Sequence, residues 1–266
     1  MMINSETNFN RVSLEFKAID GRPFQNSIPL HVLRGFFMGV LDKIDQQFAD
    51  QVHDTNDVAR FALQHRVSGF RVDLHCTIFS NEIGKRLRSF MMGTDGLVFN
   101  LGRERVLLQG ISLAEFDAMP WLQDLSSWRR FKIVFKTPTY FKTKSGAIVL
   151  FPEPAAICGN LCMLWNELVP GCPAMDSTIM LKWISEHVRV TSYQLKTGMV
   201  KLGGTGREIT GFKGWACFKI DDDDEQAKNA ANFVALLKFA EFTNVGGSRT
   251  AGLGQVACSE ISIKGN

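Results

Sequence analysis

The chain has 266 residues, which is enough for one large domain or two small ones. Its hydrophobic fraction of 45% and charged fraction of 21% are those of an ordinary folded protein, and they exclude a disordered or collagen-like chain. The net charge of +3 excludes a protein that coats nucleic acid through bulk charge, although it leaves room for a local basic surface.

The charge is distributed unevenly along the chain. Residues 1–128 hold 13 Lys and Arg against 15 Asp and Glu, whereas residues 129–266 hold 17 against 12. The first half is therefore slightly acidic and the second half basic. Because a polyanion is attracted to a concentration of Lys and Arg, the second half is the better candidate for a nucleic-acid-binding surface.

The sequence shows no targeting or membrane segment. The first residues contain no apolar run of the kind that a secretory signal needs, and the most apolar stretch, 146–166, is interrupted by Pro152, Glu153 and Pro154. The six cysteines form no CxxC pair, and most lie among apolar neighbours, which is typical of reduced, buried thiols. These features predict a cytoplasmic protein without membrane contact and without a metal or cofactor.

In the first half, apolar residues alternate or recur at helical spacing in seven segments. Leu33, Phe36, Phe37 and later apolar residues recur at steps of three and four, which predicts a helix. Ser27 is a candidate N-cap for this helix, and Pro29 suits its first turn. In chain order, the expected elements are a strand at 12–16, the helix at 33–44, strands at 60–67 and 69–74, a helix at 81–91, and strands at 97–100 and 106–111.

The second half repeats this order of elements. The expected elements are a strand at 131–135, a helix at 156–168, strands at 188–195, 196–202 and 212–220, a helix at 229–242 and a closing strand at 255–263. A strand-helix-strand, strand-helix-strand order that occurs twice predicts an α+β chain of two tandem ferredoxin-like (βαββαβ, RRM/RAMP-type) domains with antiparallel sheets. The expected domains are residues 1–127 and 128–266.

A glycine-rich segment, residues 245–255, lies between the last predicted helix and the last predicted strand. Its successive N–H groups could form an anion site, to which polar side chains would add donors, so phosphate or an RNA backbone fits its chemistry. A tight helix-to-strand connection that needs positive φ is the alternative, and the spacing alone leaves it open. The candidate RNA-binding residues here are Gly246, Gly247, Ser248, Arg249, Thr250, Gly252 and Gly254.

Several motifs resemble those of one known family. In the C-terminal half these are residues 209–215 (ITGFKGW), 239–242 (FAEF), 246–254 (GGSRTAGLG), 136–141 (KTPTYF), 151–154 (FPEP) and 164–166 (LWN). In the N-terminal half, residues 48–54 (FADQVHD) are similar to a short histidine-bearing segment. Together they resemble the CRISPR-associated repeat-processing endoribonucleases of the RAMP superfamily.

The resemblance implies that the protein cleaves CRISPR precursor RNA within each repeat to give guide RNAs for antiviral defence. It also implies metal-independent chemistry, in which a 2′-hydroxyl attacks the adjacent phosphate and leaves a 2′,3′-cyclic phosphate and a 5′-hydroxyl. The implied partners are the precursor RNA and subunits of a CRISPR effector complex, and the many phenylalanines leave room for a homodimer interface. A non-catalytic RAMP subunit that only holds RNA, and a small-molecule-binding ferredoxin-like protein, are the alternatives.

RNA cleavage of this kind needs proton-transfer groups and cations. His53 matches the family's histidine position and is the first candidate for proton transfer. His31 is the second, because the positive end of a helix dipole disfavours the imidazolium and favours a neutral base. Some relatives carry a tyrosine on the first helix where this chain has Met38, so either two histidines share the proton transfers or the activity is weak. Arg60 is the candidate stabilising cation, and Arg34 could contact phosphate, although a solvated surface arginine is the alternative for both.

Basic residues also flank the first predicted strand of the second half. Arg129 and Arg130 precede it, and Lys142 and Lys144 follow it. These four residues could line an RNA track, although exposed charge at strand ends explains them equally well. The remaining histidines, His65, His75 and His187, are expected to be packing or surface residues.

Overall fold

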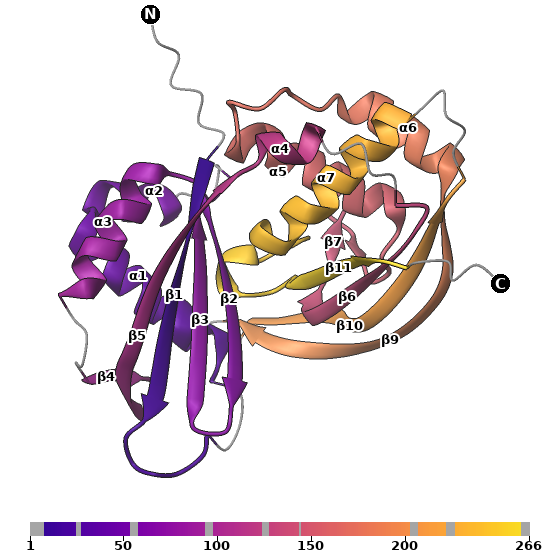
Figure 1. The fold of residues 1–266 in the computed structure, drawn as a ribbon. Helices are drawn as coiled ribbons and strands as arrows, with labels where there is room; N and C mark the ends of the chain where they lie inside the picture. The colour runs from indigo at the N-terminus through magenta and orange to yellow at the C-terminus, as the bar shows by residue number, and fades with distance from the viewer. Residues whose placement is uncertain are drawn as a thin grey trace, which may run out of the picture.

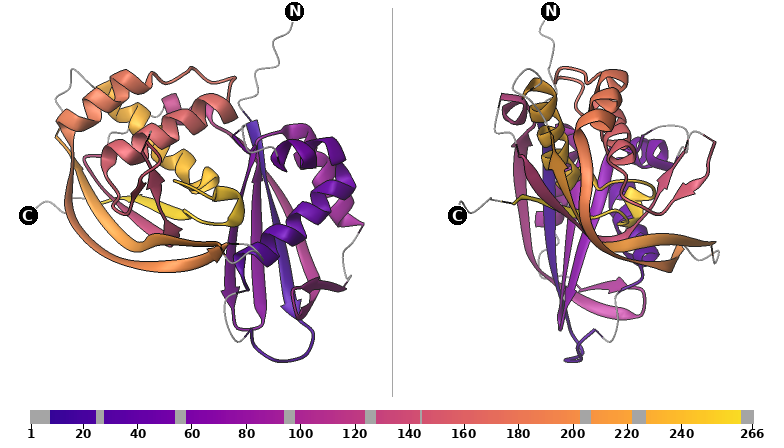
Figure 2. Two further views of the ribbon diagram at one scale, coloured as in Figure 1. Left: turned by 180° about the vertical axis from the view of Figure 1, so that it is seen from behind. Right: turned by 90° about the vertical axis from the view of Figure 1, so that its right-hand side faces the viewer.

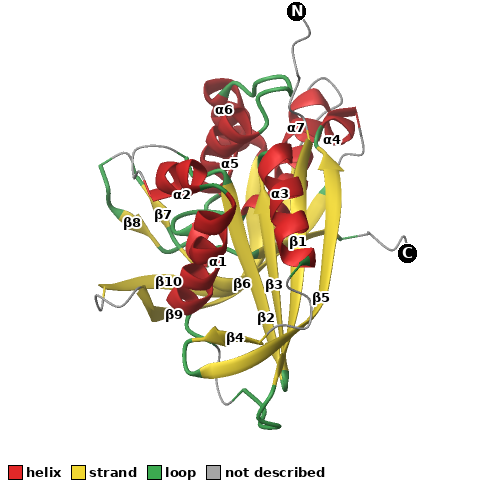
Figure 3. Ribbon diagram, turned by 90° about the vertical axis from the view of Figure 1, so that its left-hand side faces the viewer, coloured by secondary structure: helices red, strands yellow, loops and turns green. Residues whose placement is uncertain are grey.

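The computed structural model describes residues 8–24, 28–53, 58–93, 98–123, 128–143, 145–202, 207–221 and 227–261, without the side chains of residues 48, 51–53 and 207. It is an α+β fold built on two antiparallel sheets (Figure 1). The first sheet has the order β2-β3-β1-β5-β4, and three helices cover one of its faces (Figure 3). Its elements are β1 (Asn8–Ala18), α1 (Leu30–Ile44), α2 (Gln46–His53), β2 (Phe61–Ser68), β3 (Arg71–Ile78), α3 (Asn81–Met92), β4 (Val98–Leu101) and β5 (Glu104–Asp117).

The second sheet has the order β11-β6-β10-β9 and lies beneath three helices. Short elements join or interrupt it: α4 (Met119–Gln123), the hairpin of β7 (Phe141–Lys142) with β8 (Ile148–Val149), and the 3₁₀ helix η2 (Arg249–Ala251). Its main elements are β6 (Arg130–Thr139), α5 (Pro154–Leu168), α6 (Ser177–His187), β9 (Val188–Leu202), β10 (Arg207–Ile220), α7 (Ala227–Thr243) and β11 (Val256–Glu260).

The two sheets share one arrangement of strands. In the first, the opening strand β1 lies between β3 and β5, and in the second, the opening strand β6 lies between β10 and β11. Numbered within each half, both sheets therefore place their four main strands in the order fourth, first, third, second. β4 is an addition that forms a hairpin with β5 at one edge of the first sheet.

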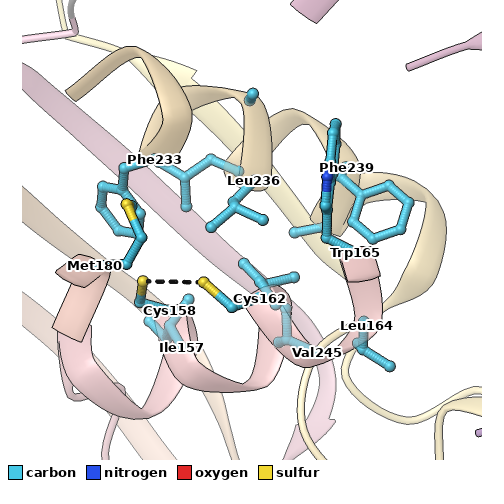
Figure 4. Close-up of a cluster of buried hydrophobic side chains, with 14 of the residues drawn as sticks. Ile157, Cys158, Cys162, Leu164, Trp165, Met180, Phe233, Leu236, Phe239 and Val245 are labelled. Atoms are coloured by element: carbon cyan, nitrogen blue, oxygen red, sulfur yellow. Dashed lines mark hydrogen bonds between the residues drawn. The ribbon is translucent and has the colours of Figure 1, made fainter. Parts of the chain in front are cut away.

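Alternation along the central strands explains why each sheet is covered on one face. In β1, Val12, Leu14 and Phe16 are buried in the core beneath α1 and α3, while the residues between them point to the opposite face. The core of the second half lies between its sheet and α5, α6 and α7 (Figure 4), where the rings of Trp165 and Phe239 meet edge-on at 5.2 Å. In the same core, the sulfur atoms of Cys158 and Cys162 lie 3.8 Å apart as free thiols.

The second half packs against the outer face of the first sheet. The C-terminal end of helix α7 lies against that face (Figures 1 and 2). Phe9 of β1 is fully buried, and its ring lies 5.1 Å from that of Phe242 and 6.4 Å from that of Phe239, both on α7. Arg11 donates to the carbonyl of Glu241 at 2.7 Å and stacks over the Phe242 ring at 4.3 Å. The two halves are thus joined by a shared apolar core and by hydrogen bonds.

The structure differs from the expected elements in several places. The separate strands predicted at 188–195 and 196–202 are one strand, β9, because its register against β10 runs through Leu195, Lys196 and Thr197 without a break. Helix α6 was not predicted. Pro29 is the N-cap of α1 rather than a residue of its first turn, and Ser27, the predicted cap, lies outside the described residues. Within the described part of the chain, no helix is long and apolar enough to cross a membrane.

Candidate active site

The glycines of the glycine-rich segment are required by packing against the protein itself. A Cβ on Gly254 would lie 1.8 Å from the carbonyl oxygen of Val245, and one on Gly246 would lie 2.2 Å from that of Tyr140. Both have positive φ, as has the non-glycine Ser248 at 58°. The close approach that glycine permits is therefore made to neighbouring backbone, which agrees with the tight-connection interpretation.

Most N–H groups of the segment have acceptors within the protein. The N–H of Gly246 donates to Asn160 Oδ1 at 2.8 Å, that of Gly247 to Tyr140 O at 3.0 Å, and that of Gly254 to Pro138 O at 3.1 Å. Three successive N–H groups, those of residues 248–250, have no acceptor within the described part of the chain. Only this short stretch of backbone is available to an anion, rather than the whole segment.

Arg249 occupies a different position from the one that the sequence suggested. Its side chain is buried, and its guanidinium donates to Thr243 O and Ala59 O, both at 3.1 Å. Burial lowers the pKa of Arg249 to about 10, so the group stays charged at neutral pH. No carboxylate pairs with it among the described residues. As folded, the Arg249 side chain holds the two halves together and does not reach solvent to contact RNA.

A network of amides fixes the segment to strand β2 of the first half. Asn244, which follows α7 in the left-handed conformation, donates from Nδ2 to Leu63 O at 2.8 Å, and its Oδ1 accepts from Gln64 Nε2 at 2.8 Å. Leu253 packs with Leu30, the first residue of α1. The segment is therefore held in place by β2 and by the start of α1.

The glycine-rich segment, β2 and the start of α1 meet at a junction between the two halves. His65 of β2 lies in this junction and was not predicted as a site residue. Gln255 Nε2 lies 3.2 Å from His65 Nδ1 and 3.3 Å from Gly252 O. Because only an amide nitrogen can donate to the Gly252 carbonyl, Nε2 must also be the donor to the imidazole, and Nδ1 must carry no proton. Burial lowers the pKa of His65, which favours the same neutral form.

His31 lies at the same junction. It is the second residue of α1, directly after Leu30, whose side chain is 3.5 Å from the position that a Cβ on Gly252 would take. The His31 side chain is half-buried, and its Nδ1 is shielded from solvent without a hydrogen-bond partner among the described residues. The other ring nitrogen, Nε2, is not shielded and has no hydrogen-bond partner among the described residues, so it is the atom that a bound ligand can reach. Arg34 follows three residues later, on the same side of the helix.

The remaining predicted residues divide into those near the junction and those remote from it. Arg60 is exposed and follows Ala59, whose carbonyl oxygen accepts a hydrogen bond from the Arg249 guanidinium. His53 is the last residue of α2, and its side chain lies outside the described part of the chain, as does all of Lys144. Lys142 is exposed on β7, two residues after Tyr140.

Arg129 and Arg130 lie far from the glycine-rich segment. They stand at the start of β6, whereas the segment packs at the other end of that strand, beside Pro138 and Tyr140. A strand of ten residues is about 30 Å long at roughly 3.3 Å per residue. The structure therefore does not bring these two arginines together with His31 and the glycine-rich segment.

Several polar residues that build the junction were missed because they are distant in sequence. Tyr140 lies in the motif 136–141 and Gln255 in the glycine-rich segment, but neither was predicted as a site residue, and Asn160 had no distinguishing motif. Asn244 did carry a signal, since Asn directly after a helix is a common left-handed cap. Within the described ranges, no group of three or more His, Cys, Asp or Glu side chains is placed to hold a metal ion.

Comparison with known proteins agrees with this architecture. The sequence profile of the CRISPR-associated endoribonuclease Cas6 matches residues 133–256. A CRISPR-associated endoribonuclease Cas6 from Streptococcus thermophilus is 26% identical over 251 residues, which cover 92% of this chain and 96% of that protein. Among solved structures, a Cas6 product complex has a TM-score of 0.77 at 18% identity and covers 95% of this chain and 100% of its own. Thermus thermophilus Cas6 has a TM-score of 0.71 at 18% identity and covers 95% and 99%.

The overall fold is that of the solved Cas6 structures, and the sequence similarity to the Streptococcus thermophilus Cas6 runs along nearly the whole chain. In both sequence and fold, the chain is therefore similar to the Cas6 family of CRISPR-associated endoribonucleases.

Proposed function

We propose that this protein cleaves CRISPR precursor RNA within its repeats, without a metal ion, through attack of a 2′-hydroxyl on the adjacent phosphate. The products are a 2′,3′-cyclic phosphate and a 5′-hydroxyl. We also propose that residues 1–127 and 128–266 are two ferredoxin-like domains, which the fourth-first-third-second strand order of both sheets supports. The RNA then lies against the junction between these domains.

The observation that carries the proposal is the placement of His31. His31 lies on the first turn of α1, beside the glycine-rich segment, and its Nε2, unlike the shielded Nδ1, is accessible and has no hydrogen-bond partner in the described protein. An accessible imidazole nitrogen without a partner can accept the proton of the attacking 2′-hydroxyl. A second group must protonate the departing 5′-oxygen, and His53, at the end of α2, is the candidate for that step.

Positive charge around the junction stabilises the negative charge that develops on the phosphorane. Arg249 is a buried cation without a carboxylate partner in the described residues, so its electric field acts across the glycine-rich segment. The free N–H groups of residues 248–250 add donors, and Arg34, Arg60 and Lys142 add mobile charge. Arg249 thus acts on RNA through its field and by holding the segment, without direct contact.

The test is a cleavage assay with the cognate repeat RNA in the presence of EDTA, followed by mapping of the product ends. We expect one cut per repeat, a cyclic phosphate on the upstream product, and at least a 100-fold lower rate for His31→Ala and His53→Ala with RNA binding retained. His187→Ala is the matched control, because that imidazole bonds to Asp221 O at the far end of the second sheet.

Two outcomes would refute the proposal. Cutting that requires a divalent metal, or that leaves a 3′-hydroxyl, contradicts the mechanism. RNA binding without any cut identifies the non-catalytic RAMP subunit instead.

A further inference from the structure

The outer face of the second sheet, away from its helices, carries an exposed basic surface with a tryptophan at its centre. The helices cover the face bearing Phe131, Ile133 and Phe135, so the residues between these on β6 point outward. The register of the sheet places outward residues of four strands side by side. They are Arg130, Lys132, Val134 and Lys136 of β6, Lys213, Trp215, Cys217 and Lys219 of β10, Arg189, Ser192, Gln194 and Lys196 of β9, and Ala257 and Ser259 of β11.

Acidic side chains do not neutralise the centre of this surface. Asp221 pairs with Arg189 and Lys219 at one end of the sheet. Around Trp215, the surface carries Lys196 and Lys213, both exposed, and no carboxylate is among its outward residues. Four lysines, at positions 132, 136, 196 and 213, therefore surround one aromatic ring.

The tryptophan is not a core residue. Trp215 is half-buried, and it belongs to none of the buried apolar clusters of the described chain. The ammonium of Lys132 lies 4.6 Å from the centre of its ring. A cation over a partly exposed ring is held only weakly, so a flexible lysine can move aside for a flat ligand. A ring with mobile cations around it suits a base that stacks while its phosphates pair with lysine.

Strand β10 connects this surface with the candidate active site. Trp215, Lys213 and Ile209 point to the same side of β10, and Ile209 packs with Leu253 of the glycine-rich segment. Six residues of strand separate Trp215 from Ile209, which is about 20 Å at roughly 3.3 Å per residue. A single strand of RNA that leaves the junction can therefore follow one strand of protein to the tryptophan.

We infer that the outer face of the second sheet around Trp215 binds single-stranded RNA that flanks the segment to be cut. This inference rests on the proposed function and adds a second contact region for the same RNA. Stacking needs an unpaired base, so the surface is selective for single-stranded flanks over duplex. It raises the affinity for long precursor RNA and takes no part in the proton transfers.

The test compares the binding of two labelled RNAs: the repeat alone, and the repeat extended by a single-stranded flank. The wild-type protein should bind the extended RNA about 10-fold more tightly, because one unpaired base of the flank stacks on the Trp215 ring. Trp215→Leu should abolish that difference. The double variant Lys132→Gln/Lys213→Gln should reduce it and should lower the salt slope for the extended RNA by about 1.4.

Two matched controls should keep the difference between the RNAs. Tyr193→Leu removes an exposed aromatic ring from β9 that pairs with Ala216 and points to the other side of the hairpin. Lys182→Gln removes an exposed lysine from α6, on the helical side. Ultraviolet crosslinking of the extended RNA, mapped by mass spectrometry to β10, provides a readout that does not depend on a variant folding.

The possible results separate the two proposals. Equal affinities of the wild type for both RNAs, or a Trp215→Leu protein that keeps the difference, would overturn the inference even if the repeat is cut as proposed. If the wild-type protein cuts no RNA, and the Trp215→Leu protein loses the preference for the flanked RNA that the wild type shows, the proposed cleavage is refuted and this RNA-binding surface is supported. Crosslinks confined to α5 or α6 would overturn the inference about this surface.

Discussion

The contact between His65 and Gln255 works only while the imidazole is neutral. Nδ1 of His65 accepts the amide N–H of Gln255, so a proton on Nδ1 would place two donors face to face. Protonation of His65 would therefore loosen the hold of the first half on the glycine-rich segment. The histidine acts as a positioning residue for that segment.

This contact predicts a loss of stability in acid. Burial lowers the pKa of His65 in the folded protein below the value of about 6.5 of the unfolded chain, so the unfolded chain binds more protons between the two values. As the pH falls from 7.5 to 5.5, the contribution of His65 to the free energy of unfolding should decrease, by at most about 1.4 kcal/mol per pH unit. His65→Gln, with its neutral amide, should reduce this acid sensitivity.

Urea unfolding midpoints at pH 7.5 and 5.5 measure the effect. His75, whose pKa burial and Arg11 also lower, is present in both proteins and cancels in the comparison. His187→Gln is the control and should follow the wild type. An acid sensitivity that is unchanged by His65→Gln would contradict the role of this imidazole.

Arg249 allows a second test at the scale of a residue. Arg249→Met keeps most of the apolar volume but leaves Thr243 O and Ala59 O without their donor, and each unsatisfied buried carbonyl costs about 1–3 kcal/mol. We expect the free energy of unfolding to fall by about 2–5 kcal/mol. Arg66→Met, at an exposed position of β2, should change it by less than about 0.5 kcal/mol. Similar midpoints for both variants in urea would place Arg249 outside the interface.

At the scale of elements, the sequence predicted what local periodicity determines. The helices α1, α5 and α7 and the strands β1 and β6 bury the residues that the spacing of apolar side chains along the sequence indicates. Helix α6 was missed because it follows a run rich in Gly and Pro, although Asp176 caps it by accepting from the N–H groups of Thr178 and Ile179. β9 was divided in two because its residues are mostly exposed and show no clear alternation.

The glycine-rich segment could be located from sequence but its function could not. Its glycines indicate positive φ or close approach, and the structure shows that backbone of the same protein is approached. The atoms that an added Cβ would meet belong to Tyr140 and Val245, and their closeness to the glycines is set by the tertiary structure. Local pattern alone therefore could not decide between an anion site and a packed connection.

Gly254→Ala tests how closely this element is packed. The new Cβ would need to lie 1.8 Å from the backbone oxygen of Val245, and φ is +72°. We expect a loss of more than about 3 kcal/mol in the free energy of unfolding, because backbone must move. Gly21→Ala is the matched control, since Gly21 has a φ of +64° with nothing within 4 Å of the new Cβ. It should cost only the left-handed strain of about 1–2 kcal/mol. Equal losses would mean that strain, rather than packing, requires Gly254.

At the scale of the whole molecule, the candidate site exists only because the two halves are in contact. His31 comes from the first half and the glycine-rich segment from the second, and β2 and α7 hold them together through Gln64, Asn244 and Glu241. No local pattern predicts which outward residues of one sheet contact a helix more than 170 residues away. The sequence therefore predicted the candidate histidines and the segment but not the residues that join them.

Phe9 tests whether the halves behave as one unit. The ring is fully buried and contacts Phe79 and Phe116 in the first half and Phe239 and Phe242 on α7. Phe9→Ala should cost about 3–5 kcal/mol and weaken the apolar link across the interface, where Phe79 and Phe116 keep their own contacts with α7. The five tryptophans, at 121, 128, 165, 183 and 215, lie close to or within the second half, so fluorescence follows that half while circular dichroism follows the whole chain. In urea, the two transitions should coincide for the wild type and separate for Phe9→Ala.

Phe16→Ala provides the matched comparison for this experiment. Phe16 is equally buried on the same strand, but it faces the core under α1 and contacts only the first half. Its removal should destabilise the protein by a similar amount while the interface keeps the two transitions together. If Phe9→Ala also unfolds in one coincident transition, the halves are coupled by the polar contacts of Arg11, Gln64 and Arg249 rather than by the aromatic core, and cooperativity must then be lost with Arg249→Met instead.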